Sequence, residues 1–309
     1  MPNLEIKVNG EKLLFYDSFN FSDQIDAIYS SVSFNSFVDY EAFGYAPIEV
    51  YRDGILIFTG EIISKTIPSE IPPKPFNYKA ASKTHILSEC TLPTESYPLQ
   101  IENVTLKDIV EYICSFFEIS VIFDESTVSE ANGNYKLSNL GIGENASSII
   151  NQLVTQSGLI LTHDSYGRLI VTKEIIQSEL ILPKFTSNNK SFDLKKFYHN
   201  YIALGQAPIG QSNDIQAIAS FSNIDERRNI TKIQDSGGID IIESKAEGMR
   251  LDSLKAINQG LTFNNFFCNI GDFIYINDQR LVINQLNYSY NAGGEVASIS
   301  LLDSKIYER

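Results

Sequence analysis

Apolar and polar residues alternate along the first 90 residues, as in strands with one buried face. Residues 4–8 alternate in this way and stop at Asn9-Gly10, a hairpin turn signal. A clearer hairpin spans residues 47–63, where Asp53-Gly54 supplies the positive φ of a tight turn. Prolines cannot join a strand ladder, so residues 68–75 are predicted to form an exposed loop between two strands.

The pattern changes to helical spacing at about residue 92. Thr105 is predicted to cap a helix whose apolar side chains share one face: Leu106, Ile109, Val110, Ile113, Phe116 and Phe117. A second helix is predicted over residues 145–157, ending at Gly158. With short strands beside them, these helices indicate a small α/β domain over residues 92–182.

After this domain the chain returns to a β pattern. Residues 183–191 are interpreted as a linker, residues 207–242 as a polar, irregular insertion or mobile loop, and residues 243–258 as a helix. Four strands are predicted near the end, over residues 263–268, 272–276, 280–290 and 296–302.

The second β region repeats the first. Residues 49–58 and 274–283 both read as strand, tight Asp-containing turn and strand, and a longer hairpin follows each. One interpretation is that unrelated hairpins look alike. The other is a mainly β, α+β fold with two related antiparallel β-barrel domains, at residues 1–91 and 183–309, and the small α/β domain between them.

Short motifs in a fixed order carry a family resemblance across nearly the whole chain. They are Val8-Asn9-Gly10, Ile48–Gly54, Phe58–Ile62, Ala81–Cys90, the helix with Leu106, Asp108 and Ile109, Leu204-Gly205-Gln206, and Leu301–Tyr307. In this series the chain resembles the baseplate hub of Mu-like phages and the late control D proteins of P2-like phages.

The resemblance implies a structural hub of a contractile tail. It implies a homotrimer in which each subunit gives two barrels to a ring of near six-fold symmetry, joining the six-fold tail tube to the three-fold central spike. The implied partners are the tail tube protein, the central spike protein and neighbouring baseplate proteins. The protein would be located in the virion baseplate and assembled in the cytoplasm of the bacterial host.

The net charge of -14 decides against nucleic-acid and membrane binding. Gripping phosphates or an anionic membrane normally requires a basic surface. DNA passing through a tail must slide without sticking, so we expect a channel lined by acidic or neutral groups. The N-terminus lacks an apolar signal core, and no apolar run reaches membrane-spanning length, so we expect no stable membrane insertion.

No residue pattern indicates catalysis, a metal or a cofactor. His85, His163 and His199 lie outside any metal-binding motif, and Cys90, Cys114 and Cys268 form no CxxC pair. The favoured interpretation is that the thiols are reduced and buried and that each histidine is a surface residue or a satisfied strand residue. We therefore expect no catalytic residue, no metal ligand and no cofactor-binding residue.

The alternative is a cell-wall hydrolase or a carbohydrate-binding tail module. Glu118, Asp124 and Glu125 could supply glycosidase carboxylates, although their separation cannot be read from the sequence. Phe116-Phe117 could form a sugar platform, but helix core is the better interpretation. The segment 141–144 could cradle an anion before a helix, but a plain helix entry is favoured.

Overall fold

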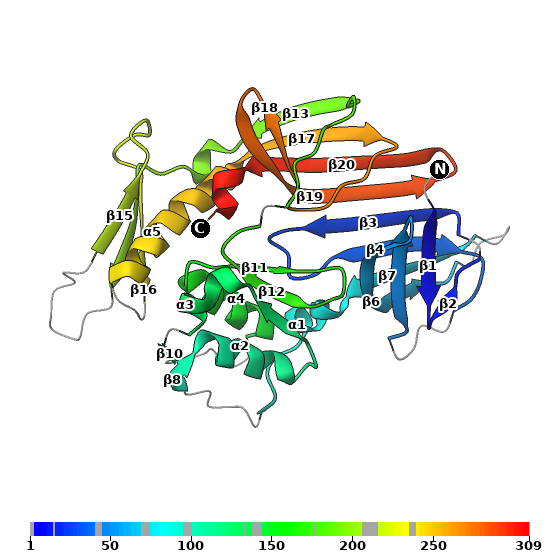
Figure 1. Ribbon diagram of the computed structural model, residues 1–309, viewed down its shortest axis with the longest axis horizontal. Coiled ribbons are helices and arrows are strands. Elements are labelled where there is room, and N and C mark those ends of the chain that lie inside the picture. Colours follow the sequence, from blue (N-terminus) through cyan, green and yellow to red (C-terminus); the bar gives the residue numbers. More distant parts are fainter. Residues whose placement is uncertain are drawn as a thin grey trace.

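A large antiparallel sheet dominates the computed structural model (Figure 1). The structure describes residues 3–14, 16–40, 45–68, 74–94, 101–132, 134–137, 144–175, 177–205, 216–234 and 239–308. Within these ranges the chain is mainly β, as the sequence predicts, and no helix is both long and apolar enough to cross a membrane.

The first seven strands form one half of the large sheet. They are β1 (Leu4–Val8), β2 (Glu11–Lys12), β3 (Ser18–Gln24), β4 (Ser31–Ser36), β5 (Pro47–Arg52), β6 (Ile55–Thr66) and β7 (Phe76–Ser82). Alternate residues of β1 and β4 are buried, because each strand turns one face to the core. The predicted turns are present, with φ of 54° at Asn9 and 51° at Asp53.

The other half comes from the end of the chain. Its strands are β13 (Ser187–Phe192), β17 (Ile257–Asn264), β18 (Phe273–Ile276), β19 (Gln279–Asn291) and β20 (Gly294–Asp303). The linker expected at residues 183–191 was wrong, because β13 occupies most of it and pairs with β17. Residues 257–264, not 263–268, form the next strand.

The two halves have the same strand order. The first runs β3-β4-β7-β6-β5 and the second β13-β17-β20-β19-β18, with every pair antiparallel. The strands also occur in the same order along the chain. The repeat suggested by the turns at Asp53 and Asp278 is therefore a repeat of topology.

Pairing of β3 with β19 joins the two halves into one sheet of 12 strands. The path runs from β13 to β2, and no pair among the described strands closes it. Neither half is a separate closed barrel within the described residues, in contrast to the predicted architecture. A shared core lies on one face, with Phe19, Phe34, Tyr78 and Tyr288 among its fully buried side chains.

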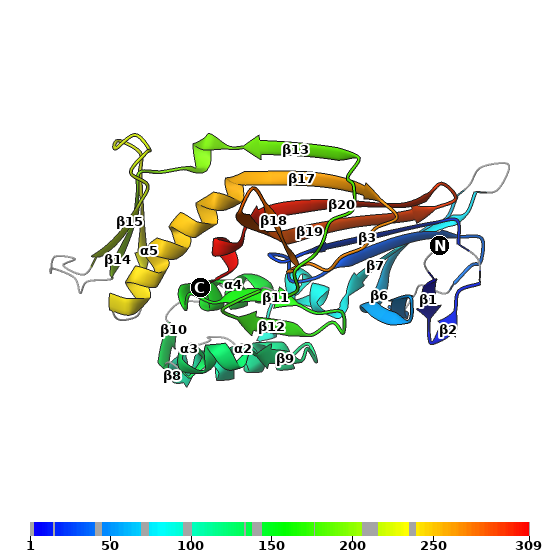
Figure 2. The same cartoon turned by 45° about the horizontal axis from the view of Figure 1, so that its top comes forward.

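A small α/β unit lies between the two halves in sequence and beneath the large sheet in space (Figure 2). Its helices are α1 (Ile86–Glu89), α2 (Leu106–Ser115), α3 (Val128–Ala131) and α4 (Ala146–Gln156), and its strands are β8 (Ile101–Thr105), β9 (Val121–Phe123), β10 (Asn134–Leu137), β11 (Ile160–His163) and β12 (Leu169–Thr172). The predicted cap is present, because Thr105 Oγ1 accepts a hydrogen bond from the Asp108 amide. The apolar faces of α2 and α4 share one core.

A third unit projects from the second half. It contains β14 (Asn200–Gly205), β15 (Gln216–Ser220), β16 (Asn229–Gln234) and the helix α5 (Ile239–Ser253). The irregular loop expected over residues 207–242 was wrong in part, because it holds two strands and the start of α5. Alanine side chains form much of the small core, so no strong apolar pattern marked these strands. The unit leaves and rejoins the sheet between β13 and β17.

Candidate functional site

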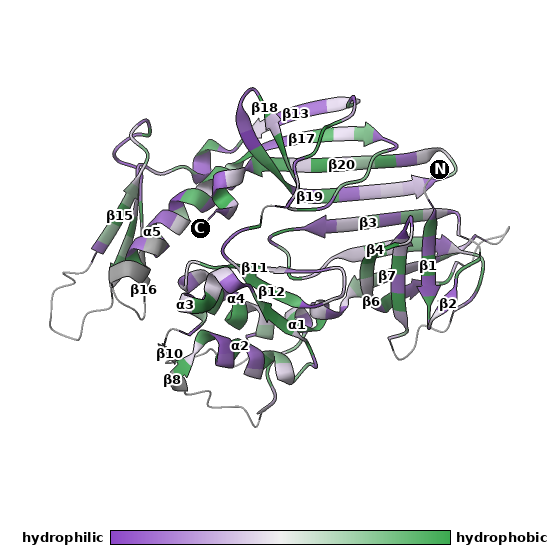
Figure 3. Cartoon of the chain, viewed as in Figure 1, coloured by the Kyte–Doolittle hydropathy of each residue, from purple (hydrophilic) through white to green (hydrophobic). Residues whose placement is uncertain are grey.

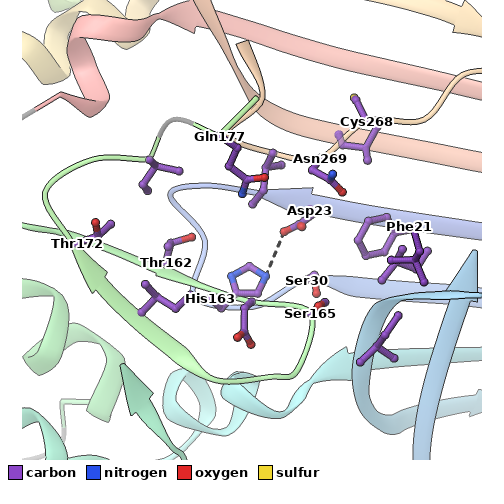
Figure 4. A pocket seen from close by; sticks show the side chains of 18 of the residues that line it. Phe21, Asp23, Ser30, Thr162, His163, Ser165, Thr172, Gln177, Cys268 and Asn269 are labelled. Carbon is purple, nitrogen blue, oxygen red and sulfur yellow. Dashed lines mark ion pairs between the residues drawn. The ribbon is translucent and has the colours of Figure 1, made fainter. Parts of the chain in front are cut away.

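A polar pocket lies where the α/β unit meets the large sheet (Figure 4). Its volume is about 460 Å³, and its walls come from β3, β11, β12 and residues 267–270. His163 on β11 points toward Asp23 on β3, with 3.1 Å between Nε2 and Oδ1. His163 Nδ1 lies 3.0 Å from the carbonyl oxygen of Ala27.

Through these contacts the pocket connects the α/β unit to the large sheet. The His163 side chain is almost fully buried and the Asp23 side chain is 18% exposed, so their contact is largely shielded from water. Thr162 Oγ1 is buried beside them without a hydrogen-bond partner. The arrangement positions the α/β unit on the sheet, and it offers no nucleophile activated by a base.

The other histidines also contact backbone carbonyl groups. His85 Nδ1 lies 3.0 Å from the Ser82 oxygen, and His199 Nδ1 lies 2.9 Å from the Ile224 oxygen. His85 Nε2 is 3.6 Å from Glu61. In the described part of the chain, no three His, Cys, Asp or Glu side chains gather as a metal site would require.

The carboxylates considered for glycoside hydrolysis lie on short connecting segments. Asp124 caps a 3-10 helix and accepts a hydrogen bond from the Ser126 amide. The Ser126 hydrogen bonds hold the pKa of Asp124 below its usual value, whereas a general acid needs a raised pKa. Phe116 and Phe117 pack against the core of the α/β unit. Residues 141–143 lie outside the described residues.

On the face of the large sheet opposite the core, the part formed by β3, β4, β7, β19 and β20 is polar but almost uncharged, and we call it the neutral face. A hollow of about 530 Å³ on it is lined by residues of these strands. Its polar side chains are Asn20, Ser22, Ser31, Ser33, Lys79, Asn287, Ser289 and Ser298. Lys79 is the one charged side chain among the described lining residues. In Figure 3, hydrophilic and hydrophobic residues alternate along these strands.

Among the strands whose edges no described strand covers are β13 and the end of β6. β13 pairs only with β17, and all six of its residues are exposed. β6 continues past its β5 partner at Glu61 to Thr66, while β7 follows it on the other side. An exposed strand edge carries backbone groups that another chain can pair with. Sequence reasoning missed β13 because its polar residues give no alternation.

Comparison with known proteins identifies the α/β unit. Residues 84–173 match the family model described as baseplate hub protein gp44-like, second domain. This segment is therefore similar to the second domain of gp44-like baseplate hub proteins. The resemblance to phage baseplate hubs predicted from the sequence is thereby confirmed. Among curated proteins, no sequence matches the chain significantly.

Solved phage tail proteins share the fold over nearly the whole chain. The 43 kDa tail protein of prophage MuSo2 from Shewanella oneidensis is 18% identical, with a TM-score of 0.77 and 99% of each chain covered. A tail protein from Neisseria meningitidis MC58 is 14% identical, with a TM-score of 0.77 over 99% of this chain and 98% of that one. Prophage tail protein gp18 from Listeria monocytogenes is 13% identical, with a TM-score of 0.65 over 96% and 94%.

Proposed function

We propose that the chain is a non-catalytic baseplate hub of a contractile phage tail, present as a homotrimer in the virion. The single observation that carries this proposal is the repeated strand order of the large sheet. Two equivalent modules in each of three subunits give six equivalent positions, which is what an adaptor between a six-fold tube and a three-fold spike requires. The gp44-like match of residues 84–173 supports the same role.

The proposed trimer has three units per chain, at residues 1–91, 92–182 and 183–309. The two β units of each chain form its share of a β-barrel ring. The tail tube protein would contact one side of this ring and the central spike protein the other. The segments 68–75 and 207–242 would contact other subunits or neighbouring baseplate proteins, since both are longer and more polar in sequence than simple connections need.

The neutral face would line the channel of the ring. A chain of net charge -14 places a single lysine among the described residues that line the hollow on this face. Each lysine or arginine that neutralises a phosphate adds affinity through counterion release, so a Ser- and Asn-rich wall lets DNA pass without sticking. The hydrogen-bonding side chains keep the wall hydrated.

Mass measurement of the purified chain by light scattering tests the assembly. Three times the 34.6 kDa chain mass is expected. A stable monomer at high concentration would contradict the proposal. Electron microscopy of the parent particle tests the position, because the chain should lie between the tube and the spike. Clearing of a peptidoglycan suspension by the pure protein would instead favour the hydrolase alternative.

A further inference from the structure

One junction inside the chain shows how two sheet modules join. β3 of the first half pairs antiparallel with β19 of the second, with Ser22 opposite Asn287. The Ser22 hydroxyl donates a hydrogen bond to the Asn287 side chain at 2.8 Å. Past the end of β3, the Ile25 amide donates to the Asn284 carbonyl at 2.9 Å. Ile25 is fully buried there.

Matching irregularities fix how one half superposes on the other. β6 has a register shift after Ile62, and β19 has one after Ile283. Just before each shift, a strand amide donates a hydrogen bond to the carbonyl of the residue that precedes the neighbouring strand. The Ile62 amide donates to Ala46, before β5, at 2.9 Å, and the Ile283 amide donates to Asp272, before β18, at 2.8 Å. The same irregularity therefore occurs at the same place in both modules.

Counting from this shared point gives residue equivalences across the sheet. One row of paired residues crosses the first half and its equivalent crosses the second: Thr66, Asn77, Asn35 and Ser18, and then Asn287, Ser298, Thr262 and Ser187. By this count Thr66 on β6 is equivalent to Asn287, and Ser191 on β13 is equivalent to Ser22. The same count makes Leu194 equivalent to Ile25.

These edges of β13 and β6, which no described strand covers, are the counterparts of the two strands that join inside the chain. The part of β6 beyond Glu61 is equivalent to the part of β19 that pairs with β3, and β13 is equivalent to β3. Apolar side chains are exposed on both edges: Ile67 is 67% exposed beside β6, and Leu194 is 67% exposed beside β13. Ile25, the residue equivalent to Leu194, is buried at the internal junction. Leu194 is therefore an apolar side chain suited to burial in a contact of the same kind, which a single chain does not provide.

We propose that β13 of one copy pairs antiparallel with β6 of the next copy, in the register of the internal junction. Thr66 then lies opposite Ser191, and the Ile63 carbonyl accepts a hydrogen bond from the Leu194 amide. The occupant of each edge is a second copy of this chain, because the template for the contact is built into the chain itself. The closure at three copies rests on the proposed function, since head-to-tail contacts form a ring or a filament according to their rotation.

A disulfide crosslink tests this register. Directly opposed residues of an antiparallel pair have Cα atoms about 4.5–5.5 Å apart, within the range a disulfide spans. In a Cys90→Ser background, the double variant Thr66→Cys with Ser191→Cys should crosslink one chain to the next under mild oxidation. Non-reducing electrophoresis should show dimers and trimers that revert to single chains on reduction.

Matched variants define the register. Ser22→Cys with Asn287→Cys reproduces the contact within one chain and should give a disulfide without raising the mass. Thr66→Cys with Ser187→Cys keeps the same face but displaces the partner by four residues, about 13 Å, and should not crosslink. Equal crosslinking of this displaced pair would overturn the proposed register.

A charged substitution at Leu194 tests the contact independently, through the mass of the assembly. Leu194→Glu should shift the assembly to monomers, whereas Ile181→Glu, at a side chain 94% exposed, should leave the mass unchanged. A trimer that forms without the Thr66–Ser191 crosslink and survives Leu194→Glu refutes the strand contact and leaves the hub proposal standing. A wild-type chain that is monomeric throughout refutes both.

Discussion

The Nε2 atom of His163 lies 3.1 Å from Oδ1 of Asp23, although the two residues are separated by most of the α/β unit and half of the first β module. The other ring nitrogen contacts the Ala27 carbonyl. Of the two contacts, the one at Nδ1 has hydrogen-bond geometry, whereas Nε2 lies close to the carboxylate without a hydrogen bond. One side chain thus connects β11 to the β3 strand and to the turn that follows it.

Replacing His163 with leucine should weaken the attachment of the α/β unit. The Ala27 carbonyl loses its hydrogen-bond partner and the Asp23 carboxylate loses the adjacent imidazole, which costs roughly 1–3 kcal/mol of unfolding free energy. Urea unfolding measures the change. Glu111→Gln, which removes the exposed Lys107–Glu111 pair, is the control and should change the free energy by no more than about 0.5 kcal/mol. Equal effects of the two variants would show that the buried contact does not stabilise this attachment.

Glu295 connects the two β halves through Arg52. Its Oε2 lies 3.2 Å from Arg52 Nη2 and accepts a hydrogen bond from the Tyr288 hydroxyl at 2.9 Å. Burial raises the pKa of Tyr288, which keeps this hydroxyl a donor. Glu295→Ala leaves the largely buried guanidinium without this partner and should lower the unfolding free energy by about 3 kcal/mol.

Thermal and urea unfolding check the Glu295 prediction. Glu308→Ala is the matched control, because it removes the more exposed partner of Arg280, and it should cost about 0.5 kcal/mol. If Glu295→Ala unfolds like the wild type, the Arg52 contact contributes nothing to joining the halves.

Two strand glycines should respond differently to alanine. A Cβ on Gly60 would lie 2.0 Å from the Ala81 carbonyl oxygen, a backbone atom that cannot rotate away. Gly60→Ala should therefore cost about 3 kcal/mol or prevent soluble expression. At Gly260 the nearest atoms to a new Cβ are 3.9 Å away, so Gly260→Ala should be tolerated. Comparison of the two midpoints of thermal unfolding measures the difference, and similar midpoints would contradict the prediction.

The cysteines should differ in reactivity. Burial raises the pKa of the Cys114 thiol to about 12 and also raises that of Cys268, so neither supplies much thiolate at neutral pH. Cys90 is partly exposed. Iodoacetamide at pH 8 should label Cys90 in the native protein, and all three cysteines after unfolding in guanidinium. Peptide mass spectrometry identifies the labelled sites, and native labelling of Cys268 would contradict its burial.

Local signals in the sequence predicted part of this fold well. The turn at Asp53 and the helix cap at Thr105 depend on residues close in the chain, so their chemistry is visible in the sequence. β13 was missed because both its faces are exposed, and Ser-Asn-Asn-Lys-Ser-Phe then lacks the alternation that marks a strand. The pair of β3 and β19 was also missed, because strand pairing across more than 260 residues leaves no local pattern.

The contact between His163 and Asp23 was harder to predict from the sequence than these strands. His163 was expected to be a surface or satisfied strand residue, and it lies on β11 with Nδ1 3.0 Å from the Ala27 carbonyl oxygen; nothing in the sequence indicated Asp23 as its neighbour. Asp23 lies at a position of β3 that turns away from the neutral face, and only the docking of the α/β unit gives it a function. Such a pair is set by tertiary packing.

The connection between the first two strands differs between the two halves of the large sheet. In the first copy the short segment between β3 and β4 holds the α/β unit through Ala27. In the second copy the equivalent connection, between β13 and β17, carries the unit that contains α5. Because the strand order repeats, each connection has a counterpart, so one can contain an inserted unit while the other keeps its packing. In the proposed trimer, this asymmetry of the two corners would let a ring of modules with one strand order carry different attachments on alternate members, which a six-fold assembly of a single module could not do.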